Sequence, residues 1–319
     1  MAPVAKKRMR ESSPLFILGK MLERGMIGER EYERAMGESP TVLDNEKNNT
    51  PHSWYTETVI SDVIADLMTE WGLSREAAVR TVYSGGLSIY TAQSPTVQST
   101  LESYFANPAH FGNVEGLQSA MVIIDPRTGD LLGIVGSVGE KKGSRLFNHA
   151  TDALRAPGSA IKPLSVYAPA IEEGFVSWSS VFDDVPVSFT ESAAWPHNSP
   201  AVYSGLCDLY TAVVQSKNTV AVRVLEKLGI ERSYYYLTRK LGLNSILRGR
   251  YLANGDKLTD LAPAPLALGQ LTDGVSLRAL TSAYGALAAG GVYRPARSYL
   301  LVLDKKGEVL LEKKSESTT

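Results

Sequence analysis

The sequence predicts an α+β fold, in which an antiparallel sheet packs on a cluster of helices. Two stretches, residues 119–136 and 299–311, each contain two short apolar runs joined by a polar turn, which is the pattern of a β-hairpin. Several segments between them repeat their apolar residues at helical spacing. Strands at both ends with helices between them are typical of the α+β class.

The N-terminal part of the chain is predicted to be helical with one polar interruption. Residues 12–36 have the pattern of two short amphipathic helices that are separated at Gly25. Residues 38–53 are polar and Asn-rich and contain two prolines, a composition typical of a linker. A helix over residues 54–71 and another over residues 74–85 are predicted to follow.

The remaining elements are predicted in the C-terminal two thirds. The strands of the first hairpin are residues 119–125 and 130–136, and those of the last are residues 299–303 and 309–311. Helices beyond the first hairpin are predicted over residues 206–228, 232–241 and 277–289.

The composition excludes several functional classes. A formal net charge of −1 argues against nucleic-acid binding. The single cysteine, Cys207, cannot form a disulfide within the chain and is interpreted as a small buried hydrophobic residue. The 4 histidines lack metal-ligand spacing, so the sequence predicts neither a metal nor a cofactor. No apolar stretch has the length of a membrane span, and the N-terminus lacks the apolar core of a signal peptide.

Ser159 and Lys162 are the first candidate catalytic residues. Their spacing places a hydroxyl and an amine on one face of a helix, where a neutral amine can take the hydroxyl proton. A Pro-Gly pair just before the serine disfavours regular secondary structure, so a helix is predicted to begin at the serine. Pro163 would lie in its first turn and Gly174 at its end. Backbone N–H groups at a helix N-terminus can stabilise an oxyanion.

The second candidate motif is Ser216-Lys217-Asn218. A Ser-x-x-Lys pair followed by a Ser-x-Asn motif and a Lys-Thr-Gly is the signature of β-lactamases and penicillin-binding proteins. No Lys-Thr-Gly occurs in the 319 residues. Taken alone, each motif also has an ordinary interpretation, because most lysines, serines and asparagines are solvated surface residues.

Two acidic pairs, Glu172-Glu173 and Asp183-Asp184, are interpreted as surface charge. Adjacent carboxylates on one segment are not placed to flank a scissile bond, as the two carboxylates of a glycosidase are. The sequence therefore offers no glycosidase site.

The residues around both motifs resemble class A penicillin-binding proteins. The segment that carries the serine, 147–151 with 155–163, is similar to the active-serine segment of that family. Further similar stretches occur in the family's order within residues 87–312; they are 124–129, 195–198, 203–205, 216–218, 266–269, 283–284 and 290–293. Such collinearity is more specific than any single motif, and the sequence is identified as a member of the family.

The resemblance implies a domain organisation. Residues 1–40 are similar to the end of the family's glycosyltransferase domain, residues 41–115 to its linker region, and residues 116–319 to most of its transpeptidase domain. The expected fold is the penicillin-binding-protein and β-lactamase-like α+β domain, without the strand that carries Lys-Thr-Gly. The family's membrane anchor would lie upstream and that strand downstream.

Four residues depart from the commoner form of the serine segment. His149 replaces an arginine, while Ala156, Ala160 and Ile161 replace Gln, Ser and Phe. None of these changes removes a catalytic group, so they bear on the packing of the serine loop.

The resemblance also implies a reaction, acyl transfer from stem peptides that end in D-Ala-D-Ala. Ser159 is expected to be the nucleophile and Lys162 its base, provided that desolvation or a neighbouring cation lowers the lysine pKa. Ser216 is expected to pass a proton to the leaving amine, and Asn218 to hold the substrate amide. β-Lactams resemble the acyl donor and are expected to trap Ser159.

Trp195 and Asn198 are expected substrate-binding residues at the border of the cleft, although a packing tryptophan and a turn asparagine explain them equally well. The expected partners are peptidoglycan stem peptides, the lipid-linked precursor, β-lactams and other cell-wall synthesis proteins. The parent protein is expected at the outer face of the cell membrane.

Two other functions stay open. A D,D-carboxypeptidase or a β-lactamase-like hydrolase could use the same scaffold, although the glycosyltransferase-like residues 15–36 argue against it. A non-catalytic penicillin-binding module is the other alternative. Without the third motif, this stretch of chain is itself expected to be inactive.

Overall fold

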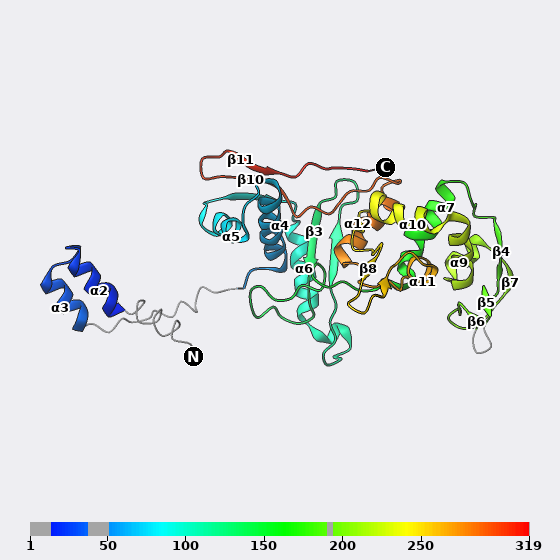
Figure 1. The fold of residues 1–319 in the computed structure, drawn as a ribbon, viewed down its shortest axis with the longest axis horizontal. Coiled ribbons are helices and arrows are strands. Elements are labelled where there is room, and N and C mark those ends of the chain that lie inside the picture. The colour runs from blue at the N-terminus through cyan, green and yellow to red at the C-terminus, as the bar shows by residue number, and fades with distance from the viewer. Residues whose placement is uncertain (1–13, 38–50, 190–193, 319) are drawn as a thin grey trace. The chain divides into compact units, whose positions relative to one another are not determined.

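The computed structural model describes residues 14–37, 51–189 and 194–318, and Figure 1 shows its ribbon. The chain forms two compact units that divide between Thr50 and Pro51. The first contains α2 (Pro14–Glu23) and α3 (Glu29–Gly37). These are the two short helices predicted for this stretch, and Gly25, with φ of 66°, lies in the turn between them.

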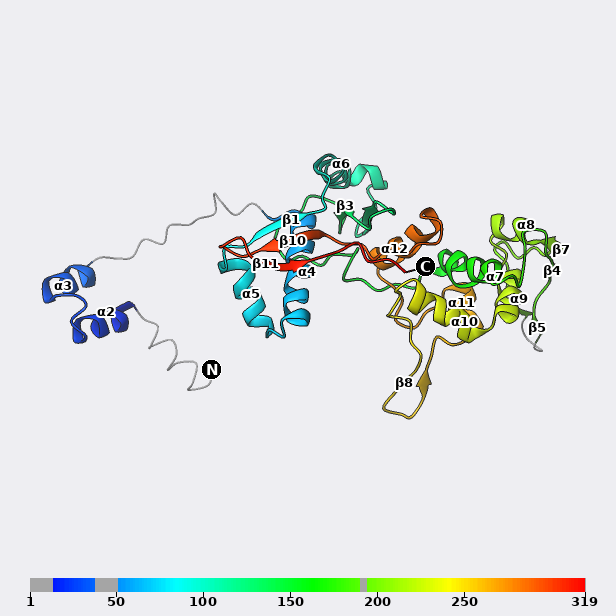
Figure 2. The same cartoon turned by 90° about the horizontal axis from the view of Figure 1, so that it is seen from above.

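The second unit begins with two helices that pack on a three-stranded antiparallel sheet. α4 (Trp54–Glu70) and α5 (Arg75–Ser84) lie beside this sheet in both views (Figures 1 and 2). Its strands are β1 (Ser88–Thr91), β10 (Tyr299–Leu303) and β11 (Val309–Glu312), in the order β1-β10-β11. The last predicted hairpin is therefore confirmed.

From Pro51 on, the stretch predicted as a linker region folds as part of the second unit. Tyr55 of α4 is buried, and its hydroxyl lies 2.7 Å from the carbonyl oxygens of both Leu131 and Ser298. These bonds join α4 to segments from the middle and the end of the chain.

The first predicted hairpin, β2 (Met121–Ile124) and β3 (Leu131–Val135), is also confirmed. α6 (Pro95–Ala106) packs on β3, followed by the 3₁₀ helix η2 (Pro108–Phe111). The amide of Gln98 accepts from Ile134 N–H and donates to Ile134 O, both at 2.9 Å. This side chain takes the place of a neighbouring strand on β3, which limits pairing with other chains.

The candidate catalytic residues belong to a helical cluster around α9 (Asn218–Leu228). Six of its apolar side chains are buried in the largest core of the unit. α7 (Ala168–Glu172), α10 (Ile230–Tyr235) and α11 (Pro263–Leu268) gather around α9, with β4 (Val181–Asp184) and β7 (Gly205–Asp208) beside it in both views (Figures 1 and 2). The other elements of this part are β5 (Ser188–Phe189), β6 (Ala194–Trp195), β8 (Arg250–Tyr251), β9 (Lys257–Leu258) and α12 (Leu277–Ala288), the last as predicted.

The continuous helix predicted over residues 206–228 is wrong. Residues 205–208 form strand β7, which pairs antiparallel with β4. Asp208 then caps α8 (Leu209–Val214), accepting from Thr211 N–H at 2.7 Å. The helical conformation is interrupted at Ser216 before α9 begins. The pairing with β4 is a non-local contact that periodicity cannot detect.

Two other predicted helices are irregular. The serine segment consists of the 3₁₀ helix η3 (Gly158–Ile161), the π-helix η4 (Pro163–Tyr167) and α7, and Gly174 follows its end with φ of 74°. Pro163 has no N–H to continue the ladder from the first turn. The helix predicted over residues 232–241 is α10 followed by the π-helix η5 (Tyr236–Lys240).

Candidate active site

Ser159 lies in the first turn of the serine segment and is exposed to solvent. Its carbonyl accepts from the N–H of Lys162, which closes the 3₁₀ turn. Among the residues that the structure describes, no hydrogen bond involves its hydroxyl group. The hydroxyl is thus accessible and not committed to a structural contact.

Lys162 is buried, with only 2% of its surface exposed, although it follows an exposed turn. Its Nζ lies 2.8 Å from Ser216 O, 3.1 Å from Ser216 Oγ and 2.6 Å from Asn218 Oδ1. Desolvation by burial lowers the pKa of Lys162 to about 8. The two predicted motifs therefore meet at one amine, and that amine is neutral far more often than an ordinary lysine at the same pH.

The partners of Lys162 suit a group that gains and loses a proton. A neutral amine has two N–H groups, which the obligatory acceptors Ser216 O and Asn218 Oδ1 can take, and one lone pair. A hydroxyl such as Ser216 Oγ can either donate to that lone pair or accept from an ammonium. Both charge states of Lys162 can thus be satisfied without a change of partner.

Ser216 occupies a backbone conformation that glycine usually takes. Its φ is 53°, and it follows the C-terminal end of α8. Ser216 N–H donates to Val213 O at 3.1 Å and Lys217 N–H to Ala212 O at 2.9 Å, the two bonds of a Schellman motif. This motif turns the chain sharply, so that both the carbonyl and the hydroxyl of Ser216 reach Lys162.

This conformation leads to a prediction. Ser216→Gly and Ser216→Ala both remove the hydroxyl, but only alanine keeps the strain of a left-handed residue. The glycine variant is therefore expected to have the larger free energy of unfolding, by about 1 kcal/mol. Chemical denaturation of both variants measures this difference, and an alanine variant as stable as the glycine variant would contradict the assigned strain.

Asn218 begins α9 and is tied to the loop that contains Asn198. Asn218 N–H donates to Asn198 Oδ1 at 2.8 Å, and Asn218 Nδ2 donates to His197 O at 2.6 Å. The side chain of Asn198 is 6% exposed and also donates to Asp184 Oδ1 at 2.6 Å. Asn198 thus holds Asn218 in place. The expected contact of Asn198 with substrate stays a prediction.

Trp195 lies on β6, paired with Ser188 of β5, and is half-buried against the helical core. No hydrogen bond among the described residues joins its indole to Ser159, Lys162 or Ser216. Its role at the border of a substrate cleft also stays a prediction.

Two glycines hold the serine segment against the end of α11 and the segment that follows. Gly269 has φ of 73°, and a Cβ at this position would lie 2.0 Å from Gly158 O. A Cβ on Gly274 would lie 2.3 Å from the carbonyl carbon of Arg155, which pairs with Val275. The backbone on both sides of the serine turn is therefore fixed by close approaches that only glycine permits.

Gly269→Ala is therefore expected to lower the free energy of unfolding by about 3 kcal/mol or more, because a clash with backbone adds to left-handed strain. Gly290→Ala is the matched control, since Gly290 has φ of 65° but no atom lies within 4 Å of the added Cβ. The control should lose only about 1–2 kcal/mol. Equal losses in the two variants, measured by denaturant unfolding, would show that the approach to Gly158 is not tight.

The sequence interpretation missed one buried residue beneath the site, Asp184. It is 0% exposed and forms an ion pair with Lys217 at 2.8 Å, so its interpretation as surface charge is wrong, while its neighbour Asp183 is exposed as predicted. The signal was present in the sequence: in a strand that begins at Val181, Asp184 faces the same side as the apolar Phe182.

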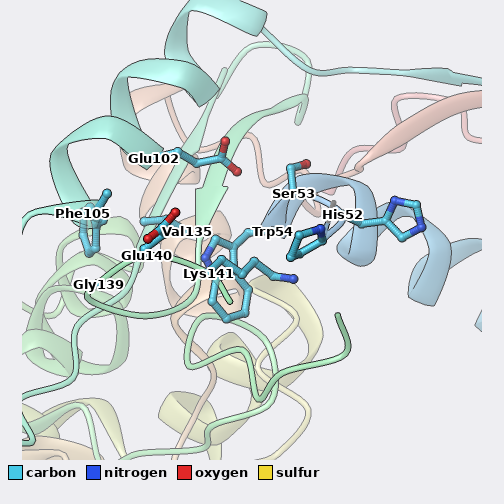
Figure 3. A pocket seen from close by; sticks show the side chains of 11 residues that line it. His52, Ser53, Trp54, Glu102, Phe105, Val135, Gly139, Glu140 and Lys141 are labelled. Atoms are coloured by element: carbon cyan, nitrogen blue, oxygen red, sulfur yellow. The ribbon is translucent and has the colours of Figure 1, made fainter. Parts of the chain in front are cut away.

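A pocket of about 230 Å³ lies elsewhere in the second unit (Figure 3). Trp54 and Phe105 line it together with the carboxylates of Glu102 and Glu140, and it shares no lining residue with the candidate site. Lys141 also lines the pocket, and its amine already pairs with Glu57 at 3.1 Å. In the described part of the chain, no group of three or more His, Cys, Asp or Glu side chains is arranged to hold a metal ion.

Comparisons with known proteins identify the family to which the chain belongs. Residues 119–306 match the family described as "Penicillin binding protein transpeptidase domain". Penicillin-binding protein 1A of Clostridium tetani is 30% identical over 95% of this chain and 40% of its own length, and penicillin-binding protein 1F of Bacillus subtilis is 29% identical over 94% and 38%. The chain spans about two fifths of the length of these curated relatives.

Solved structures show the same fold at lower identity. The penicillin-binding protein PonA1 of Mycobacterium tuberculosis, in complex with penicillin V, has a TM-score of 0.63 and 22% identity. A second PonA1 structure aligns with 81% of this chain and 63% of its own chain. Penicillin-binding protein 1A of Haemophilus influenzae has a TM-score of 0.58 and 20% identity, covering 100% of this chain and 58% of its own. The family match covers more than half of the chain, and the α+β fold and the resemblance to class A proteins are confirmed. This chain belongs to the penicillin-binding protein transpeptidase family.

Proposed function

We propose that this chain carries the acyl-transfer site of a peptidoglycan D,D-transpeptidase, with Ser159 as nucleophile. The observation that carries the proposal is the environment of Lys162, a buried amine with a lowered pKa, three residues after an exposed serine. This amine bonds to the side chains of Ser216 and Asn218 in the second motif. A base with a pKa close to the working pH is what general-base catalysis requires.

The proposed reaction has two halves. Ser159 Oγ attacks the carbonyl carbon of the penultimate D-Ala, and Lys162 takes the hydroxyl proton. The C–N bond to the terminal D-Ala breaks, and its nitrogen receives a proton through Ser216, leaving an ester on Ser159. The amine of a second stem peptide then attacks this ester, forms the new amide and returns the hydroxyl of Ser159.

β-Lactams fit the same first half. Attack by Ser159 opens the C–N bond of the lactam ring, but the leaving nitrogen stays tethered to the acyl group. One relative of known structure is described in complex with penicillin V. The side-chain amide of Asn218 lies against Lys162. This position supports Asn218 as the residue that binds the amide of the donor peptide or of the β-lactam.

A further proposal concerns the parent protein, meaning the longer protein of which this chain would be a part. Its curated relatives carry the name penicillin-binding protein 1A, and this chain spans about two fifths of their length. We infer that the parent is bifunctional, with a glycosyltransferase that uses the lipid-linked precursor and other cell-wall synthesis proteins as partners, at the outer face of the cell membrane. No helix in the described ranges is long and apolar enough to cross a membrane.

Product analysis tests the proposed reaction. A chain extended through a Lys-Thr-Gly strand would be incubated with a D-Ala-D-Ala stem peptide and an amine acceptor, and the products identified by mass spectrometry. Transpeptidation predicts loss of one D-Ala together with a new amide to the acceptor. Loss of D-Ala without the new amide would identify a carboxypeptidase, and unchanged peptide would leave a binding module.

A further inference from the structure

A buried carboxylate lies beneath the second motif. Asp184 Oδ1 accepts from Asn198 Nδ2 at 2.6 Å and from Thr219 Oγ1 at 2.5 Å. Its Oδ2 accepts from the N–H of Ser204 at 2.9 Å and its hydroxyl at 2.8 Å, and pairs with Lys217 Nζ at 2.8 Å. Four residues from two stretches of the chain, 198–204 and 217–219, therefore contact one carboxylate at the end of β4.

Three of these four partners touch the Ser-x-Asn motif. Lys217 is its middle residue and Thr219 follows it directly, while Asn198 accepts from the N–H groups of Asn218 at 2.8 Å and Thr219 at 3.4 Å. Asp184 itself touches neither Ser216 nor Asn218 through any hydrogen bond in the described residues. Its influence on the site can only pass through the backbone and side chains that it holds.

We propose that Asp184 is a positioning residue for acyl transfer: through Lys217, Thr219 and Asn198 it fixes the backbone of residues 216–218, and so places the Ser216 hydroxyl and the Asn218 amide around Lys162. This inference rests on the proposed function of the same site. The Schellman bonds at the end of α8 set the left-handed conformation of Ser216, and the contacts of Asp184 hold the residues that follow it. Such a strained residue persists only where its surroundings determine it.

An ionised carboxylate suits this position better than any neutral side chain. Burial alone raises the pKa of Asp184, but the hydrogen bonds from Lys217, Thr219, Asn198 and Ser204 outweigh it and hold the pKa well below its usual range. Each of these partners donates, and a carboxylate offers only acceptors. An asparagine would turn an NH₂ group toward donors and leave the buried Lys217 cation without its counter-charge.

Asp260 provides a matched control. It is also 0% exposed, and it accepts from Leu247 N–H at 2.8 Å, Thr272 N–H at 2.8 Å and Thr272 Oγ1 at 2.7 Å. It bonds to no residue of the two motifs. Asp184→Asn and Asp260→Asn therefore both disturb a buried carboxylate, but only the first disturbs the support of the motif.

The first test needs no enzymatic activity. Hydrogen exchange of the backbone N–H of Asn218 can be measured by NMR on the 319-residue chain. It is expected to be at least about tenfold faster in Asp184→Asn than in Asp260→Asn. Asn198→Ala, which removes the acceptor of that amide, should show the same acceleration. Equal exchange rates in the two aspartate variants would overturn the inference.

The second test measures acylation by a fluorescent penicillin in a chain extended through a Lys-Thr-Gly strand. Asp184→Asn is expected to slow acylation by about 10–100-fold, as misplacement of a reacting group does. Asp184→Asn combined with Lys217→Met removes both charges, so its acylation should be faster than that of Asp184→Asn alone. A slower double variant would show that Asp184 does not act through Lys217. If the unmodified chain is not labelled at Ser159, the proposed function fails, and the exchange test still decides the positioning role.

Discussion

Ser159→Ala is expected to abolish covalent labelling by a fluorescent penicillin, in a chain that extends through a Lys-Thr-Gly strand. The expected loss is complete, because no other group can form the ester once the attacking oxygen is removed. Stability should change by no more than about 0.5 kcal/mol, since the side chain is exposed and no hydrogen bond within the described residues holds it. Intact-mass spectrometry after penicillin treatment reads the adduct directly.

Ser165→Ala is the control for this variant. Ser165 lies in the π-helix η4, is fully buried, and donates to Ile161 O at 2.9 Å, so its hydroxyl cannot reach a ligand. Labelling should persist at the original rate in a folded Ser165→Ala chain. An adduct that survives in Ser159→Ala would assign the nucleophile to another residue.

The sequence predicted those parts of the fold that depend on local pattern. The hairpins and α12 are confirmed because their apolar periodicity and their turns lie within one short segment. Strand β7 was not predicted, since residues 205–208 are extended only because β4 lies beside them. The conformation of Ser216 was not predicted either. A serine does not indicate a left-handed conformation, and here the Schellman bonds at the end of α8 impose it.

The candidate site shows the same division. Flanking motifs identified Ser159, Lys162, Ser216 and Asn218, and the structure brings the last three together around one amine. They could not reveal that Asn198 accepts from the backbone of Asn218, because that bond depends on how distant segments pack. The burial of Asp184 is different, since strand alternation places it on the same face as the apolar Phe182, and only the interpretation of the acidic pair as surface charge hid it.

The environment of Lys162 leads to the second large prediction, a pH-dependent rate. At the ordinary pKa of 10.5, about one amine in three thousand is neutral at pH 7, whereas at a pKa of about 8 the fraction is about one in ten. Burial thus supplies about a 300-fold gain in the reactive form. The acylation rate is expected to rise with pH and to level off above about pH 8.

Lys162→Met keeps most of the buried volume but removes the proposed base, so acylation is expected to slow by about 10²–10⁴-fold and to lose its rise with pH. Lys141→Met is the matched control, because Lys141 is also a mostly buried lysine, bonded to Glu57 and Gly143 instead of the motifs, and its variant should keep the pH profile. A rise near pH 8 that remained in Lys162→Met would assign it to another group.

Stability provides an independent check on the same pKa. The folded pKa of Lys162 lies below its unfolded value, so between about pH 8 and pH 10.5 the unfolded chain binds more protons than the folded one. The free energy of unfolding should therefore rise with pH across this window, relative to Lys162→Met, and be flat in that comparison below it. This difference does not require the third motif, so it can be measured by denaturant unfolding on the 319-residue chain itself. A flat difference across the window would show that the amine is solvated and protonated like an ordinary lysine, and Lys162 could not then act as the base near neutral pH.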